Sequence, residues 1–373
     1  MKVMSVFGTR PEAIKMCPLV KELEQAKNIQ SIVCLTGQHK EMLQQVIDIF
    51  GTKADYNLNI MKPAQTLTTI TSSILEGMEP ILIKEKPDIV LVHGDTTTSF
   101  AVALAAFYQQ IPVGHVEAGL RTYDKYSPFP EEMNRTLTGR IAELHFAPTE
   151  NNKNNLLREN ITRNVFVTGN TVIDAFKTTV KEHFEFKDEE LKKINLKGKR
   201  CILMTAHRRE NLGQPLRNIC NAVKKIVEKF EDIEVIYPVH LNPAVQNTAK
   251  EILGQIDRVH LVAPLDVEDM HNLMARSFLV MTDSGGLQEE APACGVPVLV
   301  LRTETERPEA VEAGTVKVVG VDENTIVEEA VKLITQKPEY DKMARAINPY
   351  GDGHACERIV KYISEWFFNI SAV

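Results

Sequence analysis

The stretch Ile89-Val90-Leu91-Val92-His93-Gly94-Asp95 is typical of a buried strand that runs directly into a carboxylate. A second stretch, Ile111-Pro112-Val113-Gly114-His115-Val116-Glu117, repeats this arrangement, and a third acid, Glu131, follows on the next loop. In an open parallel sheet, the carboxyl ends of the strands face the ligand crevice. We therefore expect Asp95, Glu117 and Glu131 to converge there, where clustered acids resist full ionisation and become candidates for acid–base chemistry.

Short apolar runs alternate with helical patterns along almost the whole chain, which predicts parallel sheets with crossover helices. The expected strands of the first half are Lys2–Phe7, Ser31–Leu35, Ile89–His93, Val113–Glu117 and Leu144–Ala147, and that half ends at Val165–Asn170. The expected strands of the second half are Arg200–Thr205, Glu234–Pro238, Val259–Val262, Leu279–Thr282, Val296–Leu301 and Thr315–Val319.

This pattern predicts an α/β fold of two doubly wound, Rossmann-like domains that face each other across a cleft. We expect residues 1–170 to form the domain with the acids and residues 171–354 to form the second domain. A C-terminal helix, residues 355–373, is expected to pack back on the first domain. The charged stretch Lys181–Lys199 is either a surface linker between the halves or a solvated helix.

Length and composition narrow the class of protein. A chain of 373 residues exceeds one typical core, and its net charge of −7 gives no electrostatic footprint for nucleic acid or an anionic membrane. Its six cysteines are scattered without a Cys-x-x-Cys pair, as expected of buried, reduced thiols. We find neither signal-peptide features nor an apolar run long enough to span a membrane. A cytoplasmic protein is expected.

The stretch from Val280 to Ala291 has the form of a strand, a tight turn and the start of a helix. Gly285 and Gly286 permit close approach of the backbone to a ligand, and the N–H groups beside Ser284 favour an anion such as pyrophosphate. Glu290 lies further along that helix, where it would accept hydrogen bonds from ribose hydroxyls. The alternative is a simple capping turn.

Cationic side chains at the ends of other strands favour the anion site. They are Arg10 and Lys15 in the first half, and His207, Arg208, His240 and Arg307 in the second half. Arginine is suited to bidentate contacts with phosphate. For one of Arg208 and Arg209, a solvated charge is the simpler interpretation. Neither Gly-x-Gly-x-x-Gly nor a Walker A sequence occurs, so NAD and ATP bound through those motifs are not supported.

Each candidate also has a purely structural interpretation. Asp95 would be a good N-cap for the helix that begins near Thr96. Glu131 and its neighbour Glu132 would be ordinary surface charges, with only Glu131 facing the site. His93 and His115 are better interpreted as core histidines than as ligands, and no tight ligand spacing supports a metal.

Six motifs then occur in order: Gly8-Thr9-Arg10-Pro11-Glu12-Ala13-Ile14-Lys15, His93-Gly94-Asp95-Thr96-Thr97-Thr98, Gly114-His115-Val116-Glu117-Ala118-Gly119-Leu120-Arg121, Pro130-Glu131-Glu132-Met133-Asn134-Arg135, Thr205-Ala206-His207-Arg208-Arg209-Glu210-Asn211 and Thr282-Asp283-Ser284-Gly285-Gly286. Through them, the chain resembles the bacterial non-hydrolysing UDP-N-acetylglucosamine 2-epimerases over essentially its whole length. The resemblance implies a fold like that of the B-type glycosyltransferases, with UDP held mainly by the C-terminal half. It also implies interconversion of UDP-N-acetylglucosamine and UDP-N-acetylmannosamine by a homodimer, without metal or nicotinamide.

The resemblance implies a catalytic set of Asp95, Glu117, Glu131 and His207. The departing diphosphate would meet a cationic cradle of Arg10, Lys15, His207, Arg307 and the helix start at Ser284, Gly285 and Gly286. Loss of the C2 proton would be coupled to departure of UDP, which gives a neutral glycal and requires proton-transfer groups on both faces of C2. Closure of the cleft would keep water from the glycal. Which acid serves which face stays open.

Some bacterial members are activated by a second substrate molecule, and four positions here match that site: Gln38, Glu132, Arg208 and His240. Two further positions, Glu41 and Ala64, depart from the polar and basic residues found there. Competing functions are a glycosyltransferase that uses a UDP-sugar, a hydrolysing epimerase that frees UDP, and a non-enzymatic nucleotide-sugar sensor. The polymer pathway that would be supplied, such as a surface polysaccharide, is not encoded in the motifs.

Overall fold

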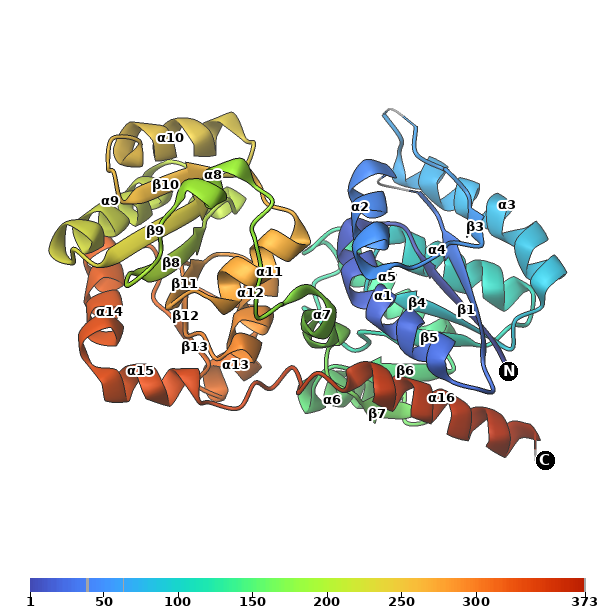
Figure 1. The fold of residues 1–373 in the computed structure, drawn as a ribbon. Coiled ribbons are helices and arrows are strands. Elements are labelled where there is room, and N and C mark those ends of the chain that lie inside the picture. The colour runs from blue at the N-terminus through green and yellow to red at the C-terminus, as the bar shows by residue number, and fades with distance from the viewer. Residues whose placement is uncertain (38–39, 63, 372–373) are drawn as a thin grey trace. The chain divides into compact units, whose positions relative to one another are not determined.

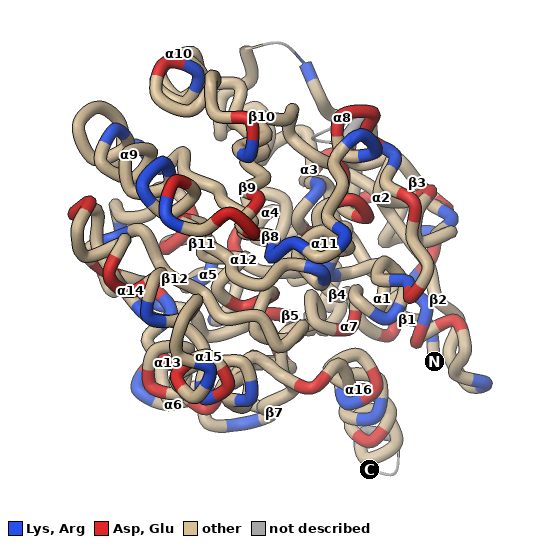
Figure 2. Tube along the Cα trace, turned by 60° about the vertical axis from the view of Figure 1, so that its left-hand side comes forward, with Lys and Arg blue, Asp and Glu red and all other residues tan. Residues whose placement is uncertain are grey.

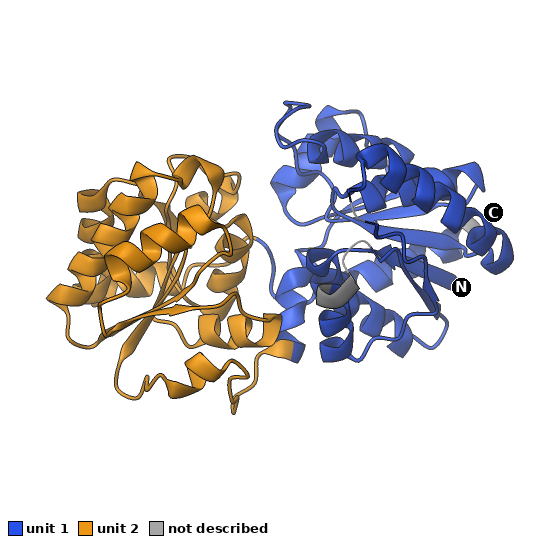
Figure 3. Cartoon of the chain, turned by 90° about the horizontal axis from the view of Figure 1, so that it is seen from above, with its two compact units in different colours: residues 1–178, 350–373 blue, residues 179–349 orange. Residues whose placement is uncertain are grey.

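The computed structural model describes residues 1–37, 40–62 and 64–371. The chain divides into two compact units, which Figure 3 shows in different colours. Unit 1 comprises residues 1–178 and 350–373, and unit 2 comprises residues 179–349. Each unit holds one parallel sheet, so the predicted pair of Rossmann-like α/β halves is confirmed.

The sheet of unit 1 has seven strands in the order β3-β2-β1-β4-β5-β6-β7 (Figure 1). They are β1 (Lys2–Phe7), β2 (Gln30–Leu35), β3 (Tyr56–Asn57), β4 (Ile89–His93), β5 (Val113–Val116), β6 (Leu144–Ala147) and β7 (Val165–Val167). The helices are α1 (Arg10–Gln25), α2 (Lys40–Phe50), α3 (Leu67–Glu85), α4 (Thr97–Tyr108), α5 (Glu131–Ile141), α6 (Glu150–Arg158), α7 (Thr171–Thr179) and α16 (Ala355–Ser371). The strand order reverses between β1 and β4, which is where a doubly wound sheet binds ligands.

Strand β4 lies at the centre of this sheet because its sequence is apolar. Its residues are all buried, as expected for a strand covered on both faces. One core cluster joins Val90 and Val92 to Met4 of β1 and to small residues of α4 such as Ala103. Strands β4 and β5 pair in register, with His93 opposite Val116. The residues that follow the two strands, including Asp95 and Glu117, therefore emerge at the same edge of the sheet.

The sheet of unit 2 has six strands in the order β10-β9-β8-β11-β12-β13, with its reversal between β8 and β11. They are β8 (Arg200–Thr205), β9 (Ile233–Pro238), β10 (Val259–Val262), β11 (Leu279–Thr282), β12 (Val298–Val300) and β13 (Val316–Val318). The helices are α8 (Glu189–Lys193), α9 (Gln214–Lys229), α10 (Pro243–Leu253), α11 (Val267–Ala275), α12 (Gly285–Glu290), α13 (Pro308–Glu312), α14 (Glu323–Thr335) and α15 (Lys337–Ala344), with short 3₁₀ turns at Arg209–Asn211 and Ala291–Cys294.

Unit 1 extends past residue 170, because α7 belongs to it except for its last residue, Thr179. The carboxylate of Asp174 on α7 accepts hydrogen bonds from the backbone N–H groups of Ala355 (3.1 Å) and Cys356 (3.0 Å), at the start of α16. These bonds attach α16 to α7 within unit 1. The charged stretch 181–199 lies within unit 2, where Asp269 of α11 accepts from the N–H groups of Lys187 and Asp188.

Figure 2 shows acidic and basic residues interspersed along the helices of both units, including α9, α14 and α16. This mixed pattern agrees with the modest net charge of −7. No helix in the described ranges is both long and apolar enough to cross a membrane. All six cysteines are free thiols, and only Cys294 is more than slightly exposed. Burial raises the pKa of the Cys17 thiol to about 12, so this thiol stays protonated.

Gly119 follows the second strand-end acid in a conformation that only glycine adopts readily. Its φ is +91°, and a Cβ atom there would lie 2.2 Å from the carbonyl oxygen of Asn152. We expect Gly119→Ala to lower the free energy of unfolding by about 3 kcal/mol, because φ strain adds to a backbone clash. Urea unfolding measures this loss. Gly51→Ala is the matched control, since Gly51 also has positive φ but a Cβ atom there would meet no atom of the described residues within 4 Å. It should cost about 1 kcal/mol, and equal losses would contradict the clash.

Candidate functional site

In unit 1, the strand-end acids occupy different electrostatic environments. Glu117 follows β5 with a left-handed φ of +61°, unusual for a residue with a side chain. Its Oε2 forms an ion pair with Nζ of Lys15 on α1. The same oxygen lies 3.3 Å from Nε2 of His93. The side-chain amide of Asn170 donates to the same oxygen at 3.0 Å. Burial opposes ionisation, but Lys15 and His93 outweigh it and hold the pKa of Glu117 well below its usual range.

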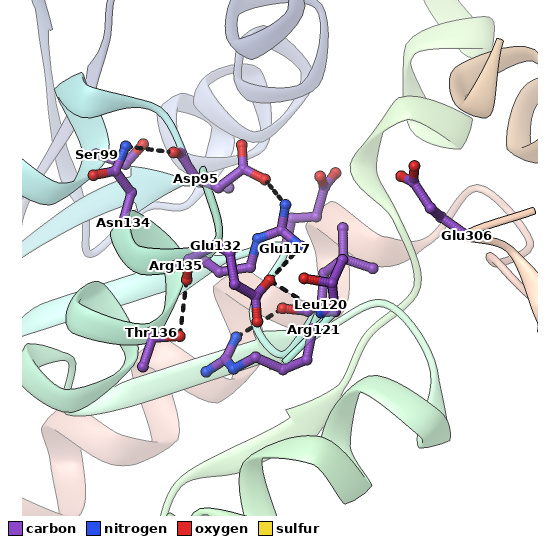
Figure 4. A network of polar contacts seen from close by, with 12 residues as sticks. Asp95, Ser99, Glu117, Leu120, Arg121, Glu132, Asn134, Arg135, Thr136 and Glu306 are labelled. Atoms are coloured by element: carbon purple, nitrogen blue, oxygen red, sulfur yellow. Dashed lines mark hydrogen bonds and ion pairs between the residues drawn. The ribbon is translucent and has the colours of Figure 1, made fainter. Parts of the chain in front are cut away.

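Asp95 follows β4, and its pKa is raised even though its carboxylate forms an ion pair. Its Oδ2 accepts from Nη2 of Arg135 at 2.6 Å (Figure 4). Burial nevertheless raises the pKa of Asp95, and the Arg135 charge offsets this only partly. The charges of Glu117 and Glu131 raise this pKa further. The two other acids thus act on Asp95 electrostatically, and the pKa values of Glu117 and Asp95 are shifted in opposite directions.

Glu131 and Glu132 are the first two residues of helix α5, but they differ in burial and in hydrogen bonding. Glu131 is half-buried, and its Oε2 is enclosed with no hydrogen-bond partner among the described residues. Glu132 is only 3% exposed, so its interpretation as a surface charge is wrong. Its carboxylate accepts from the backbone N–H groups of Thr122 (3.0 Å) and Tyr123 (2.9 Å) and lies 3.2 Å from Arg135 (Figure 4). Glu132 thereby holds both the loop after Glu117 and the arginine that contacts Asp95.

Two of the structural alternatives can be decided. The helix cap before α4 is Thr96, whose hydroxyl accepts from the N–H of Ser99, so Asp95 is not the cap. His115 is a core histidine, fully buried and 2.7 Å from the carbonyl oxygen of Gly94. Burial lowers the pKa of His115 to about 3, so it is neutral. His93 is buried too, but its contact with Glu117 makes it part of the site, which the expectation of a plain core residue missed.

In unit 2, the buried carboxylate of Asp283 organises the loop after β8. Its Oδ2 accepts from the backbone N–H groups of His207 (2.7 Å) and Arg208 (2.8 Å) and from the side-chain amide of Asn211 (3.0 Å). Asp283 is 0% exposed, at the reversal between β8 and β11. It therefore fixes the direction in which the His207 and Arg208 side chains leave the backbone.

His207 is stacked on His240, which follows β9. Their ring centroids are 5.1 Å apart and the planes are 3° from parallel. Burial lowers the pKa of His207, and the Asp283 charge only partly opposes this. The His240 ring contributes to the lowering. A neutral His207 imidazole near pH 7 follows from this environment, and it has both a donor and an acceptor nitrogen.

Two guanidinium groups flank Gly285 at the start of α12. A Cβ atom placed on Gly285 would lie 3.6 Å from Nη2 of Arg307 and 3.9 Å from Nη2 of Arg208. The guanidinium group of Arg307 forms an ion pair through Nε with the carboxylate of Glu289. The Ser284 side chain makes no capping hydrogen bond to α12. Open backbone beside two arginines suits an anion with several oxygens.

The remaining predicted residues divide between the units. Glu290 lies on α12, with Oε2 3.6 Å from Nε2 of the buried His271. Arg10 and Lys15 lie on α1 of unit 1, whereas Ser284, Gly286 and Arg307 belong to unit 2. Gln38 lies outside the described residues. Within the described ranges, no group of three His, Cys, Asp or Glu side chains is placed to hold a metal ion.

Comparisons with known proteins identify the family of this chain. The family model of UDP-N-acetylglucosamine 2-epimerase matches residues 21–364. The UDP-N-acetylglucosamine 2-epimerase of Bacillus subtilis is 58% identical, with 97% of this chain and 94% of that protein covered. A Neisseria meningitidis UDP-GlcNAc 2-epimerase, solved bound to UDP-GlcNAc, is 50% identical with a TM-score of 0.87 over 98% of this chain and 100% of that one.

A third match is the Methanocaldococcus jannaschii UDP-GlcNAc 2-epimerase, solved in complex with UDP-GlcNAc and UDP. It is 36% identical, with a TM-score of 0.76 over 98% of this chain and 100% of that one. These structural matches confirm the predicted class of two Rossmann-like halves, like that of the B-type glycosyltransferases. The chain belongs to the UDP-N-acetylglucosamine 2-epimerase family.

Proposed function

We propose that this enzyme interconverts UDP-N-acetylglucosamine and UDP-N-acetylmannosamine by eliminating UDP and adding it back, without hydrolysis. The observation that carries the proposal is the opposite setting of two neighbouring acids. Glu117 is held ionised by Lys15 and His93, as a base requires, whereas the raised pKa of Asp95 favours the protonated form that an acid requires. Environments that separate two pKa values in this way assign an acid and a base.

In the forward direction, a base removes the C2 proton of the sugar. The C–H electron pair becomes the C1=C2 double bond, and the C1–O bond breaks with its electron pair on the β-phosphate oxygen of UDP. The products are UDP and 2-acetamidoglucal, a neutral compound. A second group then delivers a proton to the opposite face of C2 while the UDP oxygen bonds to C1. Glu117, Asp95 and Glu131 supply the proton-transfer groups, and coupling proton loss to UDP departure avoids a free carbanion.

The proposed role of unit 2 is to bind the leaving diphosphate. We propose that Arg307, Arg208 and the backbone from Ser284 to Gly286 bind its oxygens, and that His207 hydrogen-bonds the departing phosphate. The two arginines beside Gly285 and the lowered pKa of His207 support these roles. Glu290 would accept from the ribose hydroxyls. Charge that develops on the leaving oxygen is stabilised by such preorganised donors.

In unit 1, Arg10 and Lys15 would add positive charge for the same diphosphate. Lys15 already contacts Glu117, so we propose that it serves mainly to keep that carboxylate ionised. Binding of UDP-GlcNAc by the Neisseria relative, and of UDP-GlcNAc with UDP by the Methanocaldococcus relative, supports a nucleotide sugar as the ligand.

Activation by a second substrate molecule is proposed for the side chains of Arg208 and His240, both in unit 2. Gln38 would belong to the same site. Glu132 is a poor contributor, because its carboxylate already serves two backbone N–H groups and Arg135. A homodimer in the cytoplasm that supplies surface polysaccharide synthesis completes the proposal, on the strength of the family resemblance.

The test is a mass balance on purified enzyme with UDP-N-acetylglucosamine, followed by phosphorus and proton NMR. The expected result is an equilibrium of two UDP-sugars, reached from either side, with total UDP-sugar conserved. Net accumulation of UDP with free N-acetylmannosamine would identify a hydrolysing enzyme. Turnover that requires an added acceptor would identify a transferase, and binding without turnover would identify a sensor.

A further inference from the structure

Asn170 is a buried polar residue that is bonded in three directions at once. Its side-chain amide donates to Oε2 of Glu117 at 3.0 Å, and its backbone N–H donates to the carbonyl oxygen of Tyr350 at 2.7 Å. Its Oδ1 accepts from the N–H of Val172 at 3.1 Å, in the first turn of α7. The residue is only 3% exposed. Its amide is therefore fixed in orientation before any ligand arrives.

The surrounding backbone holds Asn170 in place. Gly169 and Gly351 cross so closely that a Cβ atom on either would lie 3.3 Å from the Cα of the other. The chain passes from unit 1 to unit 2 after residue 178 and returns to unit 1 after residue 349. Both points lie within ten residues of Gly169 or Gly351 in the sequence. Asp174, four residues after Asn170, fixes the start of α16 through two backbone N–H groups. The segments on either side of unit 2 are thus tied together around Asn170.

We propose that Asn170 is a positioning residue for Glu117, which orients this carboxylate for proton transfer at C2. The inference rests on the proposed epimerase function. The contacts from Lys15, His93 and Asn170 all reach Oε2. Proton transfer is therefore assigned to Oε1. Lys15 acts at the end of a flexible stem, whereas the Asn170 amide is rigid and uncharged, so it fixes direction without adding charge.

The charged groups that face Glu117 make this role testable through pH. They are Lys15 from α1, His93 from β4 and Asp95 from the loop after β4. Asn170→Asp keeps the shape and the cap on Val172 but places another carboxylate against Oε2. Two carboxylates in contact do not both ionise readily, which should raise the pKa of Glu117 by about one unit or more. Activity that needs ionised Glu117 would then be lost at a higher pH.

The experiment compares the wild type with Asn170→Asp, Asn170→Ala and Asp174→Asn. For the two Asn170 variants, kcat should fall by about 10- to 100-fold with little change in KM, because the base is misdirected but the nucleotide contacts remain. The acid limb of the kcat profile should move to higher pH, further for Asn170→Asp than for Asn170→Ala. Asp174→Asn is the control, since it loosens the α16 start without touching Glu117, and should lower the melting temperature but leave the acid limb unchanged.

A second readout does not depend on turnover. Carbon-13 NMR of labelled glutamate would follow titration of the Glu117 carboxylate in the free enzyme. A raised Glu117 pKa in Asn170→Asp supports the proposal, and an unchanged pKa with an unchanged acid limb overturns it. Losses of activity that merely track melting temperature, as in Asp174→Asn, would also overturn it. A wild type that converts no UDP-N-acetylglucosamine would instead refute the proposed function, while the NMR titration still decides the role of Asn170.

Discussion

Asp95→Asn is expected to lower kcat for epimerisation by about 10²- to 10⁴-fold while the Kd for UDP stays unchanged. Asparagine has nearly the shape of aspartate and still accepts a hydrogen bond from Arg135, but it carries no titratable proton. Loss of a general acid or base typically has an effect of this size. UDP affinity should be retained because Asp95 is not among the proposed diphosphate contacts, of which Arg208, Arg307 and Ser284 belong to unit 2. Steady-state kinetics and calorimetric titration with UDP measure the two quantities.

The matched control for Asp95→Asn is Glu24→Gln, an isosteric removal of an exposed carboxylate on α1 of the same unit. It should leave kcat within about twofold of wild type, since surface substitutions have small effects. Unchanged turnover in Asp95→Asn would contradict a proton-transfer role. An equal loss of UDP affinity and kcat would show that Asp95 acts in binding instead.

Asp283→Ala is expected to remove UDP binding and to lower the free energy of unfolding by about 3 kcal/mol or more. The substitution removes the acceptor of the backbone N–H groups of His207 and Arg208 and one of the two acceptors of the Asn211 amide, which also donates to the carbonyl oxygen of Leu301. Unsatisfied buried donors cost about 1–3 kcal/mol each. The loop that carries His207 and Arg208 should then lose its fixed geometry. Urea unfolding and UDP titration measure the two losses.

Asp257→Ala is the control for this substitution, because Asp257 is an exposed acid in unit 2. It should change neither stability nor UDP affinity appreciably. If Asp283→Ala bound UDP normally despite reduced stability, the carboxylate would hold the fold but not the diphosphate site. That result would remove Asp283 from the account of the cradle.

The strands and the acids at their ends could be predicted from the sequence because both depend on local pattern. Buried parallel strands are continuous apolar runs, and the residue after each run must lie at the carboxyl edge of the sheet. This pattern predicts the positions of Asp95 and Glu117. It also predicts Gly285 at the start of the helix that follows β11.

Contacts between distant residues could not be predicted in this way. Arg135 reaches Asp95 across 40 positions, and Asn170 reaches Glu117 across 53. The sequence predicts a surface charge at Glu132, because it shows the residue type but not the direction of the side chain. Its burial depends on the loop at Thr122, which folds back to donate two N–H groups. A buried Asp283 likewise becomes recognisable only when its three donors are in place.

The most direct test of the central claim is proton NMR of UDP-N-acetylglucosamine incubated with the enzyme in deuterium oxide. Two different groups act on the two faces of C2, so the proton that returns must come from a group equilibrated with solvent. The account predicts UDP-N-acetylmannosamine that carries deuterium at C2, with no net release of UDP. UDP-N-acetylmannosamine that retains the original hydrogen at C2 would contradict proton abstraction and the elimination that follows from it.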